Sequence, residues 1–263
     1  MSATISSINY CPVKSVSFQT IEKCQIKKDV GIIGDRIFAF AKDLDLEQVK
    51  LFEKSPGERK GKWNKVLTLK NSPALNKYNF IFEEEKLTLT QKNQEILSID
   101  INQLSERESL SNKITELEHS LKQPIVLMKN DEFPFFDTSI SNKVNFINSV
   151  SLLNVQSIND FQKKIDKNIE TSIFRGNICV DNIEPWEERE WIGKVIKINN
   201  VSFKVEKNIP RCVAINLKPQ TDDNSFNLLQ SLKKTYNHFE MGIYLTALDD
   251  GEIKLSDKVQ IIN

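Results

Sequence analysis

The residues of this chain best suited to chemistry lie in the segment IPRCVAINLKP, residues 209–219, where Cys212 directly follows Arg211. A neighbouring guanidinium stabilises the thiolate form of a cysteine, which is the form that attacks electrophiles or binds soft metals. The alternative is a packing role, because cysteine is among the most frequently buried residue types. Position 212 therefore holds either a reactive thiol or a core side chain, and the surrounding motifs must decide between them.

Five further motifs precede this segment: PVKS (12–15), GDR (34–36), DTS (137–139), FRGN (174–177) and PWEEREW (185–191). With Cys212 they resemble the MOSC family, and within it the amidoxime-reducing components of mitochondria and their bacterial counterparts. The likeness extends over nearly the whole chain. It implies a mainly β protein with a few helices, in which an N-terminal β-barrel domain (1–122) precedes a C-terminal MOSC β-barrel domain (123–263) that binds the molybdenum cofactor.

The resemblance also implies which residues hold that cofactor. Cys212 matches the cysteine that ligates molybdenum, and a soft thiolate suits this role. A pterin with a phosphate requires cationic forks, hydroxyls and backbone donors that converge on one pocket. Taken singly, such residues are usually solvated charges or turn residues. As a set they are the predicted cofactor-binding residues: Lys14, Ser15, Arg36, Thr138, Ser139, Arg175, Asn177 and Arg211.

The activity that the resemblance implies is the reduction of N-hydroxylated compounds such as amidoximes or hydroxylamine-type bases. The sequence contains no iron–sulfur, haem or dinucleotide motif, so electrons must come from a separate protein of the ferredoxin, flavoprotein reductase or cytochrome type. The alternative is a carrier protein, in which Cys212 ligates a stored cofactor or holds a persulfide. A third possibility is an interaction module that has kept the fold without the cofactor.

Charge and cysteine usage narrow the range of partners. The chain of 263 residues has 36 basic and 36 acidic side chains, so no overall field favours nucleic acid or an anionic membrane. Four cysteines lie far apart, without the spacing of a zinc or iron–sulfur site. With no secretory signal and no long apolar run, we expect a cytoplasmic protein with reduced thiols that does not act on membranes.

The hydrophobic pattern predicts mostly short strands. Residues 3–9 predict a first strand, and the runs around the acidic EEE at 83–85 predict a hairpin. Leu110, Ile114, Leu117 and Leu121 form a helical stripe. Near the C-terminus, two strands are predicted to form a closing hairpin with its turn at Asp250-Gly251.

Two residues depart from the family pattern, and two further segments lead to predictions about which side chains are exposed. The proline of the relatives' FRPN motif is Gly176 here, which predicts a looser loop, and Lys70 stands where an arginine is expected. In PWEEREW we expect the tryptophans to pack and the acids to be exposed. The basic segment 57–65 is predicted to be a solvated loop, with docking of a redox partner as the alternative.

Overall fold

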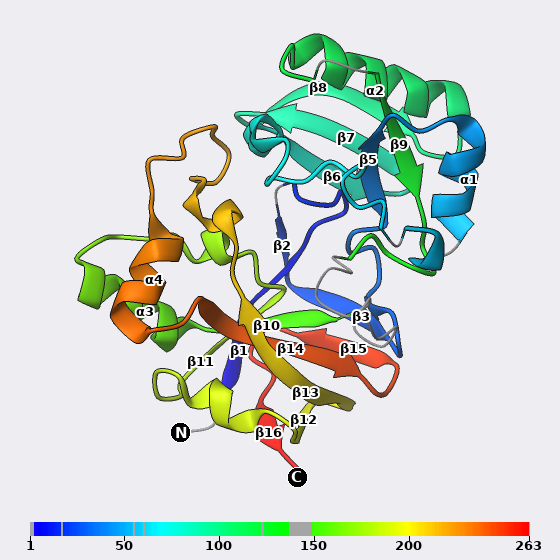
Figure 1. The fold of residues 1–263 in the computed structure, drawn as a ribbon. Helices are drawn as coiled ribbons and strands as arrows, with labels where there is room; N and C mark the ends of the chain where they lie inside the picture. The colour runs from blue at the N-terminus through cyan, green and yellow to red at the C-terminus, as the bar shows by residue number, and fades with distance from the viewer. Residues whose placement is uncertain are drawn as a thin grey trace.

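The computed structural model describes residues 3–16, 18–54, 56–59, 61–121, 124–136 and 149–262. Strands dominate these residues, and this confirms the mainly β class. The α-helices among them are α1 (Leu46–Lys54), α2 (Leu104–Leu117), α3 (Val155–Ile165) and α4 (Leu228–Tyr236). Figure 1 shows two lobes, with α1 and α2 on the outside of one and α3 and α4 at the side of the other.

The larger lobe is built on an eight-stranded sheet. Its pairs are antiparallel except for one parallel pair, β10 (Val150–Asn154) with β11 (Ile178–Asp181). The first strand of the chain lies next to β11, so the N-terminus belongs to this lobe. The order of the strands is β16 (Val259–Ile261), β12 (Val195–Ile198), β13 (Val201–Pro210), β14 (Glu240–Ala247), β10 (Val150–Asn154), β11 (Ile178–Asp181), β1 (Thr4–Tyr10) and β2 (Gln19–Ile21).

A three-stranded sheet beside it corrects the predicted closing hairpin. β15 (Gly251–Lys254) pairs with β3 (Lys23–Lys27), which pairs with β4 (Gly31–Ile32), whereas β14 pairs with β13 and β10. The pairing opposes Ile253 to Cys24, and both side chains are buried. Burial of these side chains favours the long-range partner over the local hairpin, which sequence alternation cannot distinguish.

The smaller lobe contains two sheets. The strands β6 (Asn79–Glu83), β7 (Lys86–Gln91) and β8 (Gln94–Asp100) form a meander, and this confirms the hairpin predicted around the acidic run. β5 (Phe38–Lys42) pairs with β9 (Ile125–Lys129). The predicted helical stripe is also present, since Leu110 and Ile114 of α2 are fully buried against the meander's apolar face.

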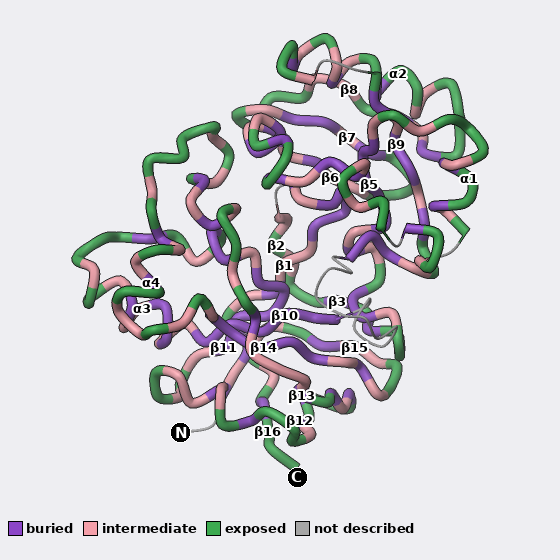
Figure 2. The backbone as a smooth tube through the Cα atoms, in the orientation of Figure 1, coloured by how far each residue is buried: buried purple, intermediate pink, exposed green. Residues whose placement is uncertain are grey.

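The two largest hydrophobic clusters of the described residues lie one in each lobe. One covers the large sheet and includes Ile8, Phe203 and Leu245, and the other fills the smaller lobe around Phe40, Phe80 and Leu89. Figure 2 shows buried backbone concentrated in these two places. The division at residues 122 and 123 remains a prediction; β1 with β11 and β5 with β9 are strand pairs that cross it.

Candidate functional site

Cys212 lies where β13 ends, at the start of a short 3-10 helix, η7 (Val213–Asn216). It is the exposed cysteine, whereas Cys11, Cys24 and Cys179 are buried. Its side chain lines a cavity of about 540 Å³. An exposed thiol at a cavity argues against the packing role that the sequence left open for this residue.

The cavity brings the predicted cofactor-binding residues together from distant segments. Lys14, Ser15, Arg36, Arg175 and Arg211 line it with Cys212. The sequence places these residues in four motifs up to about 200 positions apart, and strand pairing of β1 with β11 brings the first and the last of them to one sheet. Thr138 and Ser139 lie outside the described residues.

The turn that carries Lys14 and Ser15 is held by a buried thiol. Cys11 Sγ donates to the carbonyl oxygen of Val13 at 2.7 Å, and burial raises the pKa of this thiol, so it keeps its proton. Ser15 has a φ of 63°, in the left-handed region. Lys14 is only 8% exposed, and its Nζ lies 5.4 Å from the centroid of the Trp63 ring. The turn therefore presents Lys14 from a fixed backbone.

Arg36 is fixed from both its backbone and its side chain. It also has a left-handed backbone (φ 56°), and its amide donates to the carbonyl of Cys11 at 2.7 Å. Its guanidinium forms an ion pair with Asp35, whose other carboxylate oxygen accepts from the amide of Cys11 at 2.8 Å. The guanidinium lies 4.8 Å from the ring centroid of Phe136, another cavity residue.

Arg175 links the FRGN motif to the PVKS turn. It follows the 3-10 helix η5 (Thr171–Phe174) with a left-handed φ of 53°. Its Nη2 donates to the carbonyl of Val16 and lies 3.9 Å from Cys11 Sγ. Burial lowers the pKa of the guanidinium, and the Cys11 and Cys212 thiols favour its charged form. Arg175 thus places a cation next to the buried Cys11 thiol, in the cavity that Cys212 also lines.

Arg211 has a different role from the other arginines of the cavity. Its Nε and Nη2 both donate to the carbonyl of Met241, the former at 2.9 Å, and Nη1 donates to the carbonyl of Phe174 at 2.6 Å. Burial lowers its pKa to about 10. Because its donors are directed at the backbone, Arg211 anchors the chain beside Cys212 and contributes charge to the cavity.

Asn177 is not among the residues that line the cavity, and its predicted contact with a cofactor stays a prediction. It is fully buried, and its Oδ1 accepts from the amide and the hydroxyl of Ser151 while its Nδ2 donates to the carbonyl of Asn9. It therefore joins β1, β10 and β11. Ser151, which it positions, does line the cavity.

The sequence did not identify several further residues of the cavity. Lys207 adds a cation from β13. Phe136 and Tyr244 form an aromatic wall, with their rings edge to face and their ring centroids 6.1 Å apart. Their positions along the chain carry no motif, because each lies in an ordinary apolar or alternating segment. Only the pairing of β13 with β14 places Lys207 opposite Tyr244.

Gly176 is explained by packing. A Cβ at this position would lie 2.4 Å from side-chain atoms of Leu153, so a larger residue requires Leu153 to move. The close approach of Leu153 thus accounts for the glycine better than the looser loop that we expected. Lys70, which stands where an arginine is expected, is exposed and lines neither the cavity nor the recess described below.

The PWEEREW and 57–65 segments each contain one buried charge that the sequence did not predict. Trp191 packs in the core as expected, but Glu188 is fully buried rather than exposed. Its carboxylate accepts hydrogen bonds from Ser157 and Asn154, and burial raises its pKa. In the basic segment, Arg59 is likewise fully buried, so it is not part of a solvated docking loop.

The donor set of the cavity suits an anionic cofactor with a soft metal. Several cations, a serine turn and one exposed thiol face the same space, and such a set binds phosphate and ligates a thiophilic metal. Within the described ranges, no cluster of three or more histidine, cysteine or acidic side chains could hold a metal by itself. A metal at Cys212 would therefore need further ligands from a cofactor.

Comparisons with known proteins identify a MOSC domain in the C-terminal part of the chain. Residues 144–260 match the family model of the MOSC domain. The chain is 29% identical over 127 residues to a molybdenum cofactor sulfurase of Bombyx mori, which covers 45% of this chain and 14% of that protein. It is 27% identical over 142 residues to mitochondrial amidoxime reducing component 2 of Bos taurus, covering 49% and 42% of the two chains. The chain thus spans less than half the length of both relatives.

Among solved structures, the YUAD protein from Bacillus subtilis aligns with 99% of this chain and 96% of its own, at 9% identity and a TM-score of 0.44. YiiM from Geobacillus stearothermophilus aligns with 43% of this chain and 54% of its own, at 11% identity and a TM-score of 0.36. None of the helices in the described ranges has the length and apolar character needed to cross a bilayer.

Proposed function

Because this chain contains a MOSC domain, we propose that it is a molybdenum-cofactor-dependent oxidoreductase that reduces N-hydroxylated compounds with electrons from a separate donor protein. The observation that carries the proposal is the exposed thiol of Cys212 in a cavity that Lys14, Arg36 and Arg175 also line. The name of the bovine relative, an amidoxime reducing component, supports the reaction class.

Different residues of the cavity would bind different parts of the cofactor. Cys212 Sγ would hold the metal, and Lys14, Arg36 and Arg175 would hold the phosphate and the pterin by charge-assisted hydrogen bonds. A bound cofactor would supply the two-electron chemistry at the N–O bond. Arg175 and Arg211 place positive charge near the Cys212 sulfur.

The exposure of the residues beside the cavity supports a docking region for the donor protein. Cys212 and the next residue, Val213, are exposed, Val213 by 48%. A redox protein can therefore approach the thiol side of the cavity without displacing a buried element. The surface around Val213 replaces the basic segment 57–65 as the proposed docking region, because Arg59 is buried.

The experiment combines metal analysis with turnover. Protein expressed in a host that makes the cofactor is expected to contain molybdenum near one atom per chain and to reduce an amidoxime with a chemical electron donor. Cys212→Ser should abolish the reduction, whereas Cys24→Ser, which changes a buried cysteine on β3 that does not line the cavity, should not. Full activity of Cys212→Ser would refute the assignment.

A carrier function is the second candidate, and the exposure of Cys212 together with the sulfurase relative favours it. In that case Cys212 would carry one additional sulfur atom as a persulfide. Mass analysis distinguishes the two functions: an added sulfur on Cys212 without turnover of N-hydroxy compounds supports the carrier, and turnover with an unmodified thiol supports the reductase.

A further inference from the structure

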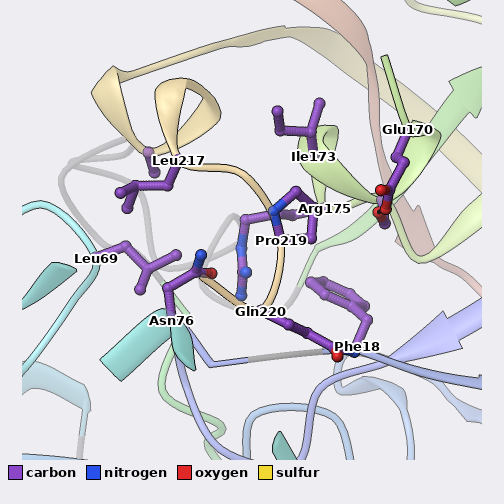
Figure 3. Close-up of a pocket in the computed structure, with 11 residues that line it drawn as sticks. Phe18, Leu69, Asn76, Glu170, Ile173, Arg175, Leu217, Pro219 and Gln220 are labelled. Carbon is purple, nitrogen blue, oxygen red and sulfur yellow. Dashed lines mark hydrogen bonds between the residues drawn. The ribbon is translucent and has the colours of Figure 1, made fainter. Parts of the chain in front are cut away.

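A second, smaller recess adjoins the cavity of Cys212. It has a volume of about 240 Å³, and Arg175 and Ala214 line both spaces. Figure 3 shows Arg175 in the middle of the recess, with Glu170 and Ile173 on one side and Leu69 and Leu217 on the other. The volume is below the roughly 300 to 1,000 Å³ of common ligand pockets, so it suits a molecule with a single ring.

The recess lies where the two lobes meet, and hydrogen bonds between them hold part of its wall in place. Asn76, from the 3-10 helix η2 (Pro73–Lys77) of the smaller lobe, is only 5% exposed. Its Nδ2 donates to the carbonyls of Lys218 and Thr221, both at 2.7 Å. These bonds fix the loop that follows Cys212, and this loop contributes Leu217, Pro219 and Gln220 to the wall. The recess therefore has a defined shape.

The lining places a charged acceptor opposite an apolar wall. Glu170 is exposed at the recess, and its Oε2 accepts from the hydroxyl of Ser172 at 3.3 Å. Leu69, Ile173 and Leu217 provide apolar surface. A carboxylate accepts hydrogen bonds and cannot donate them, so the lining favours a small apolar molecule with an N–H donor in its head group.

We propose that this recess binds the organic part of the substrate and that Glu170 selects amidoxime-type compounds over hydroxamic acids. The proposal rests on the function proposed above. An amidoxime carries an NH₂ group at the carbon where a hydroxamic acid carries a carbonyl oxygen. Glu170 accepts a hydrogen bond from the NH₂ group, whereas the carbonyl oxygen would face the carboxylate without a proton between them.

The position of Arg175 gives the ligand a direction. Its guanidinium lies at the boundary with the Cys212 cavity, so it can donate to the N-hydroxyl oxygen of a molecule whose ring occupies the apolar part of the recess. The NH₂ group then faces Glu170, and the N–O bond faces the cavity of Cys212. One carboxylate and one guanidinium thus fix the two ends of the head group.

Binding to the full chain purified without cofactor tests the recess separately from catalysis. The probes are benzamidoxime and benzohydroxamic acid, which have the same ring, titrated by calorimetry in the presence of a chelator. We expect the wild type to prefer benzamidoxime by about tenfold, as one hydrogen bond to a charged acceptor provides. Glu170→Gln, whose amide can both donate and accept, should reduce the preference to about twofold or less.

Two further variants keep the test decisive. Glu95→Gln changes an exposed carboxylate on β8 that lines neither space, and it should keep the preference. Leu69→Phe, which fills the recess from the smaller lobe, should weaken both probes about tenfold or more while melting within a few degrees of the wild type. Equal binding of both probes by the wild type, or unchanged binding by Leu69→Phe, would overturn the proposal.

Cofactor-loaded protein then separates this inference from the proposed function. If loaded wild type reduces benzamidoxime and Glu170→Gln raises KM for it with little change in kcat, the recess holds the substrate. If the loaded protein reduces benzamidoxime but Glu170→Gln changes neither constant, the recess assignment fails and the proposed function stands. If loaded protein reduces no N-hydroxy compound while the cofactor-free chain shows the expected preference, the proposed function fails and the recess remains a ligand site.

Discussion

Replacing Arg59 with methionine probes how the wall of the Cys212 cavity is held. Arg59 ends the 3-10 helix η1 (Pro56–Arg59) and is fully buried. Its Nε donates to the carbonyl of Phe52 at 2.8 Å, Nη1 to that of Pro134 at 3.0 Å and Nη2 to that of Phe133 at 2.8 Å. Burial lowers its pKa to about 10, and no ion pair to it occurs among the described residues.

The segment that Arg59 holds leads directly to the cavity. The guanidinium lies 4.0 Å from the ring centroid of Phe135, whose amide donates to the carbonyl of Arg36 at 2.8 Å. The next residue, Phe136, lines the cavity against Arg36. Loss of Arg59 should therefore loosen both Phe136 and Arg36.

The magnitude follows from the carbonyl groups that lose their donor. Methionine retains much of the side-chain volume but donates no hydrogen bond. The carbonyl of Pro134 still accepts from the amide of Phe136 at 2.8 Å, whereas the carbonyls of Phe52 and Phe133 lose the guanidinium, at a cost of about 1–3 kcal/mol for each one left unpaired. Removal of a buried charge recovers part of this cost. We expect Arg59→Met to lower the free energy of unfolding by about 2–4 kcal/mol, and Arg59→Lys, which keeps a charge but lacks the planar fork, to lie between it and the wild type.

Urea unfolding followed by tryptophan fluorescence measures this change, and molybdenum content after expression in a competent host measures the effect on the cavity. Lys54→Ala is the matched control, because Lys54 is an exposed cation at the end of α1; it should change stability by about 0.5 kcal/mol or less. A loss below about 1 kcal/mol for Arg59→Met, with normal molybdenum content, would refute the reasoning.

Three further outcomes are expected. Burial raises the pKa of Glu188 above its ordinary value of 4.5. The folded state therefore binds more protons than the unfolded state as pH rises from 4.5, and the stability of the wild type should fall over this interval. Thermal melts from pH 4.5 to 7.5 should show a smaller fall for Glu188→Gln, and parallel curves for the two proteins would contradict this expectation. Gly176→Ala should lower the free energy of unfolding by about 1–3 kcal/mol, because its new methyl group meets Leu153. In a protein that already carries Leu153→Ala, the loss caused by Gly176→Ala should largely disappear. If the losses from the two substitutions simply add in a double-mutant cycle, the contact does not explain the glycine. Asn76→Ala removes the amide that donates to the carbonyls of Lys218 and Thr221. Amide hydrogen exchange should then increase in residues 217–223 more than in α2. An equal increase in both segments would show that other contacts hold the loop.

The sequence by itself determined the local elements and the chemical candidates. Alternation and helical spacing located the hairpin of β6 and β7 and the stripe of α2, because these patterns arise from nearest neighbours along the chain. The family resemblance identified Cys212, Lys14, Ser15, Arg36, Arg175 and Arg211, all of which line one cavity. Their role in binding a cofactor stays a prediction.

Only the tertiary structure decided which groups are buried, which strands pair and which surfaces meet. The pairing of β15 with β3, the burial of Arg59 and Glu188, and the withdrawal of Asn177 behind Ser151 depend on partners that are distant in sequence. The sequence does not reveal whether a charged side chain is exposed to water or buried against carbonyl groups. Its environment is set by long-range packing, and the recess between Asn76 and Glu170 exists only because the two lobes meet there.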